Sequence, residues 1–104
     1  MKLYDILVET DDEVTVWDVD YDTECYFYGD DDNLLELSKY IDVVEVRKNG
    51  VICDICGLIN KNLNNLKDLF EVDEVDDIMA DWDAIISGYV SDEWMEKFVE
   101  VLEK

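Results

Sequence analysis

Residues 43–55 read VVEVRKNGVICDI and contain the strongest structural signal in the chain. Two β-rich runs, Val43–Arg47 and Val51–Ile55, flank the sequence Lys48-Asn49-Gly50. Asn-Gly between such runs is the strongest short-range signal for a β-hairpin, because both residues accept the positive φ angles of a type I′ turn. The stretch therefore predicts an antiparallel pair of strands.

A second hairpin is predicted nearer the N-terminus. Val14–Val19 and Cys25–Tyr28 are rich in β-branched and aromatic residues, and an acidic link, Asp20-Tyr21-Asp22-Thr23, separates them. Runs of this composition bounded by polar residues are typical of strands. Together the two hairpins predict one antiparallel sheet of about four strands.

The remaining apolar residues recur at helical spacing. They predict a short opening helix with Leu3, Ile6 and Leu7, and a second helix with Leu34, Leu35 and Leu37 that Asp or Asn of the turn Gly29–Asn33 can cap. Two longer helices are expected over Leu58–Phe70 and over Val75–Ile86, the latter ended by Gly88. A last helix is capped by Ser91 and has Phe98 and Leu102 on its inner face. We therefore expect a single α+β domain over residues 1–104, in the order α-ββ-α-ββ-α-α-α, with the helices on one face of the sheet.

The charge of the chain is its second informative property. It has 29 Asp and Glu against 8 Lys and Arg, for a formal net charge of -21. Solubility of a small domain needs a magnitude of only about 2–8, and the excess costs stability because the charges repel one another. Hydrophobic residues nevertheless make up 49% of the chain and aromatic residues 12%, which distinguishes it from disordered acidic tails. An acidic surface that opposes stability favours a positively charged partner.

Several function classes are disfavoured. The chain has no His, the usual general base and metal ligand at neutral pH, so we predict neither an enzyme nor a cofactor. Residues 1–5 lack the charged and apolar pattern of a signal peptide, and no apolar run is long enough for a membrane span. Phosphates of lipids and nucleic acids would repel the chain. We therefore expect a cytoplasmic protein that contacts neither membrane nor nucleic acid directly.

The cysteines predict structure rather than chemistry. Cys25, Cys53 and Cys56 are an odd number, as expected of reduced thiols in a cytoplasmic protein. The CxxC at Cys53-Asp54-Ile55-Cys56 is a weak redox candidate, because Asp54 and the overall negative charge disfavour a thiolate. A zinc site would lack a fourth Cys or His ligand. We expect buried, unreactive thiols.

Three acidic segments are the candidate partner-binding residues. Alternation in an extended chain would put the first set on one face, and the third is expected along the solvated edge of a helix. The candidates are Asp18, Asp20, Asp22 and Glu24 in the first segment, Asp30, Asp31 and Asp32 in the second, and Glu71, Asp73, Glu74, Asp76, Asp77, Asp81 and Asp83 in the third. Nearby aromatic residues that can anchor a partner are Trp17, Tyr21, Tyr26 and Tyr28.

Other uses of these acids remain open. Asp18-x-Asp20-x-Asp22 matches the first half of an EF-hand loop, but Thr23 and Gly29 replace the Gly and Glu that the loop requires, so a weak calcium sensor is a lesser alternative. Salt adaptation is another source of acidic surfaces, but three Cys, six Tyr and abundant Ile are not typical of it. The main alternative is a housekeeping module that binds a protein partner through an apolar groove.

In size and charge the chain resembles the DNA-mimic inhibitors of phages and plasmids: anti-restriction proteins, some anti-CRISPR proteins and the uracil-DNA glycosylase inhibitor. Separately, Leu3–Leu7, Val14–Asp18, Asn64–Phe70 and Ser91–Met95 are similar to segments of small uncharacterised proteins of bacterial and mobile-element genomes. The first resemblance is one of physical class and transfers no residue role. It implies an acidic binding protein that blocks a basic nucleic-acid-binding surface, such as that of a host defence nuclease, with an oligomeric state left open.

Overall fold

A computed structural model describes residues 1–10, 12–71, 73–86 and 92–103 of the chain. The elements are α1 (Leu3–Leu7), β1 (Val14–Asp18), β2 (Glu24–Phe27), α2 (Asp32–Ser38), β3 (Val43–Arg47), β4 (Gly50–Cys53), α3 (Ile55–Lys61), α4 (Leu63–Phe70), α5 (Val75–Ala80), α6 (Trp82–Ala84) and α7 (Asp92–Glu103). In these parts of the chain, no helix combines the length and the apolar composition that crossing a membrane requires.

The four strands form one mixed sheet in the order β2-β1-β4-β3. Both predicted hairpins are confirmed, since β1 pairs antiparallel with β2 and β3 pairs antiparallel with β4. The prediction of a purely antiparallel sheet is wrong, because β1 and β4 pair in parallel, with Val16 opposite Val51. The two more apolar strands take the centre, and the strands that carry Glu24, Glu45 and Arg47 lie at the edges, where charged side chains protect against unwanted pairing.

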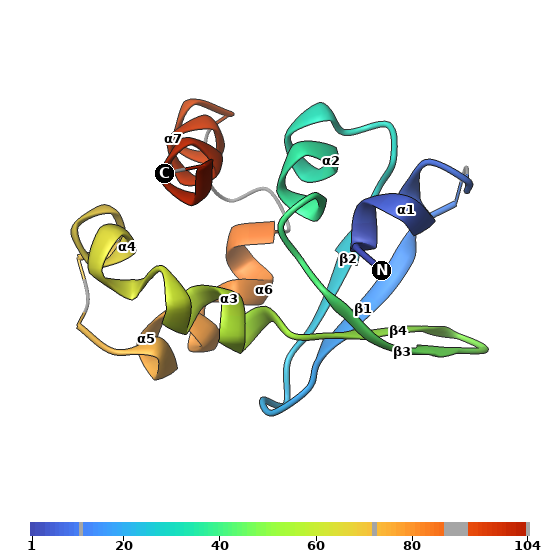
Figure 1. Ribbon diagram of the computed structural model, residues 1–104, viewed down its shortest axis with the longest axis horizontal. Helices are drawn as coiled ribbons and strands as arrows, with labels where there is room; N and C mark the ends of the chain where they lie inside the picture. The colour runs from blue at the N-terminus through green and yellow to red at the C-terminus, as the bar shows by residue number, and fades with distance from the viewer. Residues whose placement is uncertain (11, 72, 87–91, 104) are drawn as a thin grey trace.

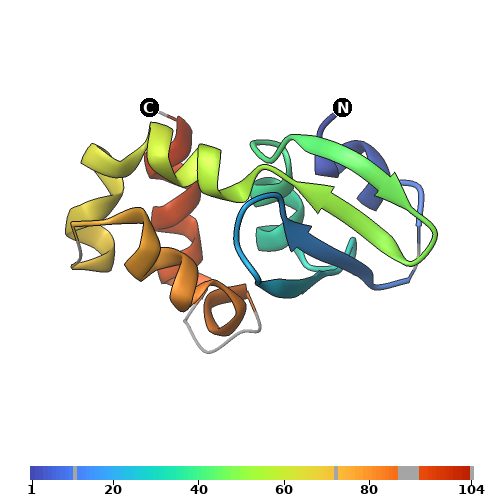
Figure 2. The ribbon, with the colours of Figure 1, turned by 90° about the horizontal axis from the view of Figure 1, so that it is seen from below.

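Helices α1 and α2 cover one face of the sheet, and in Figure 2 the strands lie in front of them. The sheet buries Val16, Phe27 and Val51 on this side. Helices α3–α7 form a second group beside the sheet (Figure 1). A single connected cluster of buried residues spans both groups, and the indole Nε1 of Trp82 donates to Sγ of Cys25 at 3.3 Å across their junction.

Two predicted helices are each divided in the structure. The helix expected over Leu58–Phe70 breaks at Asn62, whose side chain donates to the carbonyl of Leu58 at 2.9 Å. Such side-chain bonds compete with the backbone bonds that continue a helix. The helix expected over Val75–Ile86 breaks at Asp81, where the amide bonds to the carbonyl three residues earlier. The caps predicted at Gly88 and Ser91 lie outside the described residues.

The cap predicted for the second helix is confirmed. The carboxylate of Asp31 accepts hydrogen bonds from the amides of Asn33 and Leu34 at 3.0 and 3.1 Å. Those amides have no partner within the helix, so an acceptor at this position stabilises the first turn.

Candidate acidic interface

Asp18, the first residue of the predicted acidic surface, is buried with only 7% of its surface exposed. One carboxylate oxygen accepts from the amides of Asp20 and Tyr21 at 2.9 and 3.0 Å. The other accepts from the amides of Ile55 and Cys56, at the start of α3, at 2.9 and 2.8 Å. The side chain therefore joins the end of β1 to the start of α3, and it is not available to a partner.

The expectation that Asp18, Asp20, Asp22 and Glu24 share one face of an extended strand is wrong, because β1 ends at Asp18 and the chain bends directly afterwards. The sequence did contain a signal for this. Burial alternates along β1, so residue 18 lies on the same side as the buried Val14 and Val16. Because side chains alternate between the two faces of a strand, counting in steps of two from Val14 predicts that the side chain of Asp18 points into the core.

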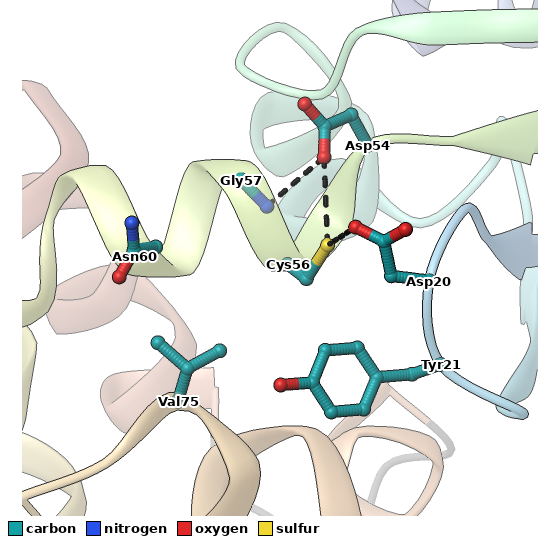
Figure 3. Close-up of a pocket in the computed structure, with 7 residues that line it drawn as sticks. All are labelled: Asp20, Tyr21, Asp54, Cys56, Gly57, Asn60 and Val75. Atoms are coloured by element: carbon teal, nitrogen blue, oxygen red, sulfur yellow. Dashed lines mark hydrogen bonds between the residues drawn. The ribbon is translucent and has the colours of Figure 1, made fainter.

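Beyond the bend, Asp20 and Tyr21 line a hollow of about 390 Å³ at the start of α3. Its other lining residues are Asp54, Cys56, Gly57, Asn60 and Val75 (Figure 3). The carboxylate of Asp20 accepts from Sγ of Cys56 at 3.3 Å. Asp54 caps α3 by accepting from the amide of Gly57 at 3.0 Å, so two acids from different segments meet at this helix start.

The hydroxyl of Tyr21 donates to the carboxylate of Asp76, a residue 55 positions away on α5. This hydrogen bond raises the pKa of Tyr21 to about 12. It also brings the first predicted acidic segment against the third. We call the combined set the linker–α5 surface; its exposed acids are Asp20, Asp22, Glu24, Asp73, Glu74, Asp76 and Asp77.

The second predicted segment lies elsewhere. Asp30, Asp31 and Asp32 line a hollow of about 440 Å³ together with Glu96 of α7, and an adjoining hollow of about 310 Å³ is lined by acids of α2 and α7. We call this set the α2–α7 surface; it comprises Asp30, Asp31, Asp32, Glu36, Glu96, Glu100 and Glu103. In Figure 1 helices α2 and α7 lie at the top, and α5 and the turn that joins β1 to β2 lie at the bottom.

Sequence reasoning therefore missed four acids of the α2–α7 surface, which are Glu36 of α2 and Glu96, Glu100 and Glu103 of α7. They belong to helices 60 residues apart by number, and only the packing of α2 against α7 brings them together. The rest of the third segment flanks the linker–α5 surface. Glu71 ends α4 with a positive φ of 58°, and Asp81 and Asp83 are exposed around α6.

Cations are distributed unevenly over the described surface. Three ion pairs join Lys2 to Asp42 at 2.6 Å, Lys39 to Glu36 at 2.8 Å, and Arg47 to Glu45. One of these pairs partly neutralises the α2–α7 surface, whereas none involves an acid of the linker–α5 surface as defined above. The linker–α5 surface thus keeps its negative charge uncompensated by these pairs.

The three cysteines are free and buried, as expected. Burial raises the pKa of Cys25 to about 12, and burial together with the charge of Asp18 raises the pKa of Cys53 to about 12. Burial and the hydrogen bond to Asp20 raise the pKa of Cys56 as well. All three are therefore thiols at neutral pH, the opposite of what nucleophilic or redox chemistry requires.

The calcium alternative loses its first ligand. Both oxygens of Asp18 face backbone amides, and the described residues contain no group of three or more Cys, Asp or Glu arranged to hold a metal ion.

No family model, no curated protein and no solved structure matches the chain. The charge and geometry of the site are therefore the basis for assigning a function.

Proposed function

We propose that the protein is an acidic binding protein that occupies the positively charged nucleic-acid-binding groove of another protein, in the manner of DNA-mimic inhibitors that act on host defence nucleases. The observation that carries this proposal is the linker–α5 surface. Two acidic segments, far apart in sequence, are joined there by the hydrogen bond from Tyr21 to Asp76, and the three ion pairs found among the described residues involve none of the seven acids of this surface.

The physical reason is the cost of such a surface. Like charges held close together repel and lower the stability of the folded state, and this repulsion is relieved when a cationic surface binds. The same long-range field accelerates association with a basic partner, and the acceleration decreases with added salt. A nuclease groove that holds phosphates by Lys and Arg offers the matching charge.

Two exposed tyrosines supply contact area: Tyr26 borders this surface through Glu24, and Tyr28 lies two residues further along, just beyond β2. The hydroxyl of Tyr26 donates to Glu24 at 2.8 Å and that of Tyr28 donates to Glu13 at 2.7 Å, so both rings are held in place on β2 and just beyond it. Aromatic rings attract Lys and Arg side chains through cation–π contacts. They are the anchors that we assign to this surface.

Not every candidate residue supports the proposal. Asp18 is structural, and Asp30, Asp31 and Asp32 belong to the α2–α7 surface on the other side of the molecule in Figure 1. One groove contacts one side of a small domain, so we assign the contact to the linker–α5 surface, flanked by Glu71, Asp81 and Asp83.

A charge-neutralised variant tests the assignment. The change D73N/E74Q/D76N/D77N removes four negative charges from the linker–α5 surface, and Asn at position 76 keeps an acceptor for Tyr21. Exposed ion pairs are worth about 0.2–1 kcal/mol each, so four lost pairs should weaken binding to a basic nuclease roughly 4- to 700-fold. Titration calorimetry against a panel of purified basic nucleases, with inhibition of DNA cleavage as a second readout, measures the effect.

The matched control is D30N/D32N/E96Q/E100Q, which removes the same charge from the α2–α7 surface and leaves the cap at Asp31 intact. It should bind nearly as well as the unmodified protein. Equal weakening by both variants would show that only total charge matters, and the assignment to one surface would be wrong.

Salt and DNA distinguish this proposal from the alternative of a protein-interaction module with an apolar groove. Binding to a nuclease groove should weaken steeply as ionic strength rises, and duplex DNA should compete for it. Binding through an apolar groove should tolerate salt and ignore DNA. The proposal further places the protein in the cytoplasm, where a defence nuclease meets foreign DNA, and gives it no direct contact with nucleic acid.

A further inference from the structure

Strand β3 forms one edge of the sheet, and most of its outer side is open. Its start is covered by the N-terminus, since the amide of Val43 donates to the carbonyl of Met1 at 2.9 Å and Lys2 bridges to Asp42. In the described sheet its only neighbouring strand is β4. Val44 and Val46 expose 56% and 61% of their surface. In Figure 1 the hairpin of β3 and β4 extends away from helices α3–α7.

The charge around this edge differs from that of the whole molecule. Lys2, Arg47 and Lys48 lie on or beside β3 with Asp42 and Glu45, so cations and anions are nearly balanced here in a chain of net charge -21. A basic partner is attracted less by this edge than by the acidic surfaces. A second copy of the chain is repelled less here than at the acidic surfaces.

We propose that β3 pairs antiparallel with β3 of a second copy of the chain, about a two-fold axis at Val46. This inference stands independently of the proposed function. In this register Val46 lies opposite Val46 of the partner subunit, and each Glu45 lies opposite an Arg47. Opposite charges in directly facing positions stabilise an antiparallel pair, and like charges destabilise it.

Neighbouring registers fail on the same rule. A two-fold axis at Glu45 would bring two carboxylates face to face, and an axis at Arg47 would do the same for two guanidinium groups. An axis at Val44 would require the part of the edge that Met1 and Lys2 already cover. Only the register centred on Val46 uses the open part of the strand with complementary charges.

The backbone favours the same register. Arg47 pairs with Gly50 across the two-residue turn of the hairpin. In such hairpins the residues that close the turn direct their amide and carbonyl groups toward each other, and the next residue along the strand directs its groups outward. Val46 therefore presents a donor and an acceptor at the open edge, as a symmetric pair centred on it requires.

The dimer should respond to salt in the opposite sense to nuclease binding. Each copy carries a charge of -21, and added salt screens the long-range repulsion between copies more than it weakens directly facing pairs. Sedimentation equilibrium of the full chain in 0.02–0.5 M NaCl should show the dimer dissociation constant falling as salt rises. A chain that remains monomeric at millimolar concentration throughout this range would overturn the proposal.

Charge exchange tests the register. E45R and R47E each place like charges opposite one another twice in the dimer, so each should weaken dimerisation roughly 10-fold or more. The double variant E45R/R47E restores complementary pairs with the original net charge, and it should dimerise as the unmodified protein does. Both side chains are exposed, and circular dichroism confirms that the variants fold. Weakening by the single variants without rescue in the double variant, or no weakening at all, would refute this register.

Discussion

Replacing Asp18 should destabilise the protein far more than replacing any exposed acid. In D18A the four amides that the carboxylate accepts from lose their partner. The amides of Ile55 and Cys56 are buried, and each unsatisfied buried amide costs about 1–3 kcal/mol. The expected loss is therefore about 2–6 kcal/mol, a large part of the 5–15 kcal/mol that typically separates folded and unfolded states of a domain.

The variant D18N separates charge from shape. Asn has one acceptor oxygen in place of two, and its amide group would direct N–H donors at the backbone donors on the other side. We expect a loss of about 2–4 kcal/mol, with roughly half of the hydrogen bonds retained. Because D18N still fills the same space, it remains measurable even if D18A does not fold.

The matched control is D22N, which removes the same charge from the exposed part of the same link. Urea unfolding at pH 7, followed by tryptophan fluorescence and circular dichroism, gives the free energy of unfolding of each variant. Removing any acid also relieves repulsion, and the control measures that contribution. If D18N and D22N differ by less than about 0.5 kcal/mol, the scatter expected of surface substitutions, the role assigned to Asp18 is wrong.

Three further predictions concern the buried cysteines and the start of α3. The pKa values of Cys25 and Cys53 are raised to about 12, against 9.0 for a free thiol, so the unfolded chain releases these protons first as the pH rises. The free energy of unfolding should therefore fall progressively between pH 9 and pH 12. Native Cys56 should resist alkylation at pH 8 until urea is added. A Cβ at position 57 would overlap the carboxylate of Asp54, so G57A should destabilise the protein by about 1 kcal/mol through loss of the cap. In a D54A background the same change should stabilise the protein by up to about 1 kcal/mol, because Ala favours a helix more than Gly does. If urea unfolding shows that G57A changes the free energy of unfolding in the same direction in both backgrounds, this account is wrong.

The local features of the fold were predictable because their causes are local. Lys48-Asn49-Gly50 predicts a tight turn, and the structure has the hairpin. Lys48 and Asn49 form its turn, and neither Asn49 nor Gly50 has the positive φ of the expected type I′ turn. Asp31 lies directly before a run of leucines, and it caps the helix as predicted. In both cases a few adjacent residues supply the whole physical reason.

The parts that could not be predicted depend on long-range packing. Either β3 or β4 can join the first hairpin, and pattern alone does not choose between the resulting antiparallel and parallel junctions. The break at Asn62 arises from a side-chain bond within an otherwise regular helical pattern. The meeting of Tyr21 with Asp76, and of Glu96 with the turn before α2, exists only in the folded chain.

The acids of this protein form two populations with opposite effects on stability. Asp18, Asp31 and Asp54 accept hydrogen bonds from amides at the starts of α2 and α3, so their charge stabilises the fold. Among the exposed acids of the linker–α5 surface, Asp20, Glu24 and Asp76 accept hydrogen bonds from side chains rather than from helix amides. Asp76 and Asp77 also lie in the first turn of α5, where the helix dipole offsets only part of the repulsion between neighbouring acids. Because Asn and Gln keep an acceptor oxygen, neutralising these acids should leave stability unchanged or raise it. D73N/E74Q/D76N/D77N should therefore bind a basic nuclease less tightly and yet unfold at an equal or higher urea concentration. Residues that lower stability but are required for binding are expected at a functional surface. A variant that loses both stability and binding would instead indicate that these acids, like Asp18, support the fold.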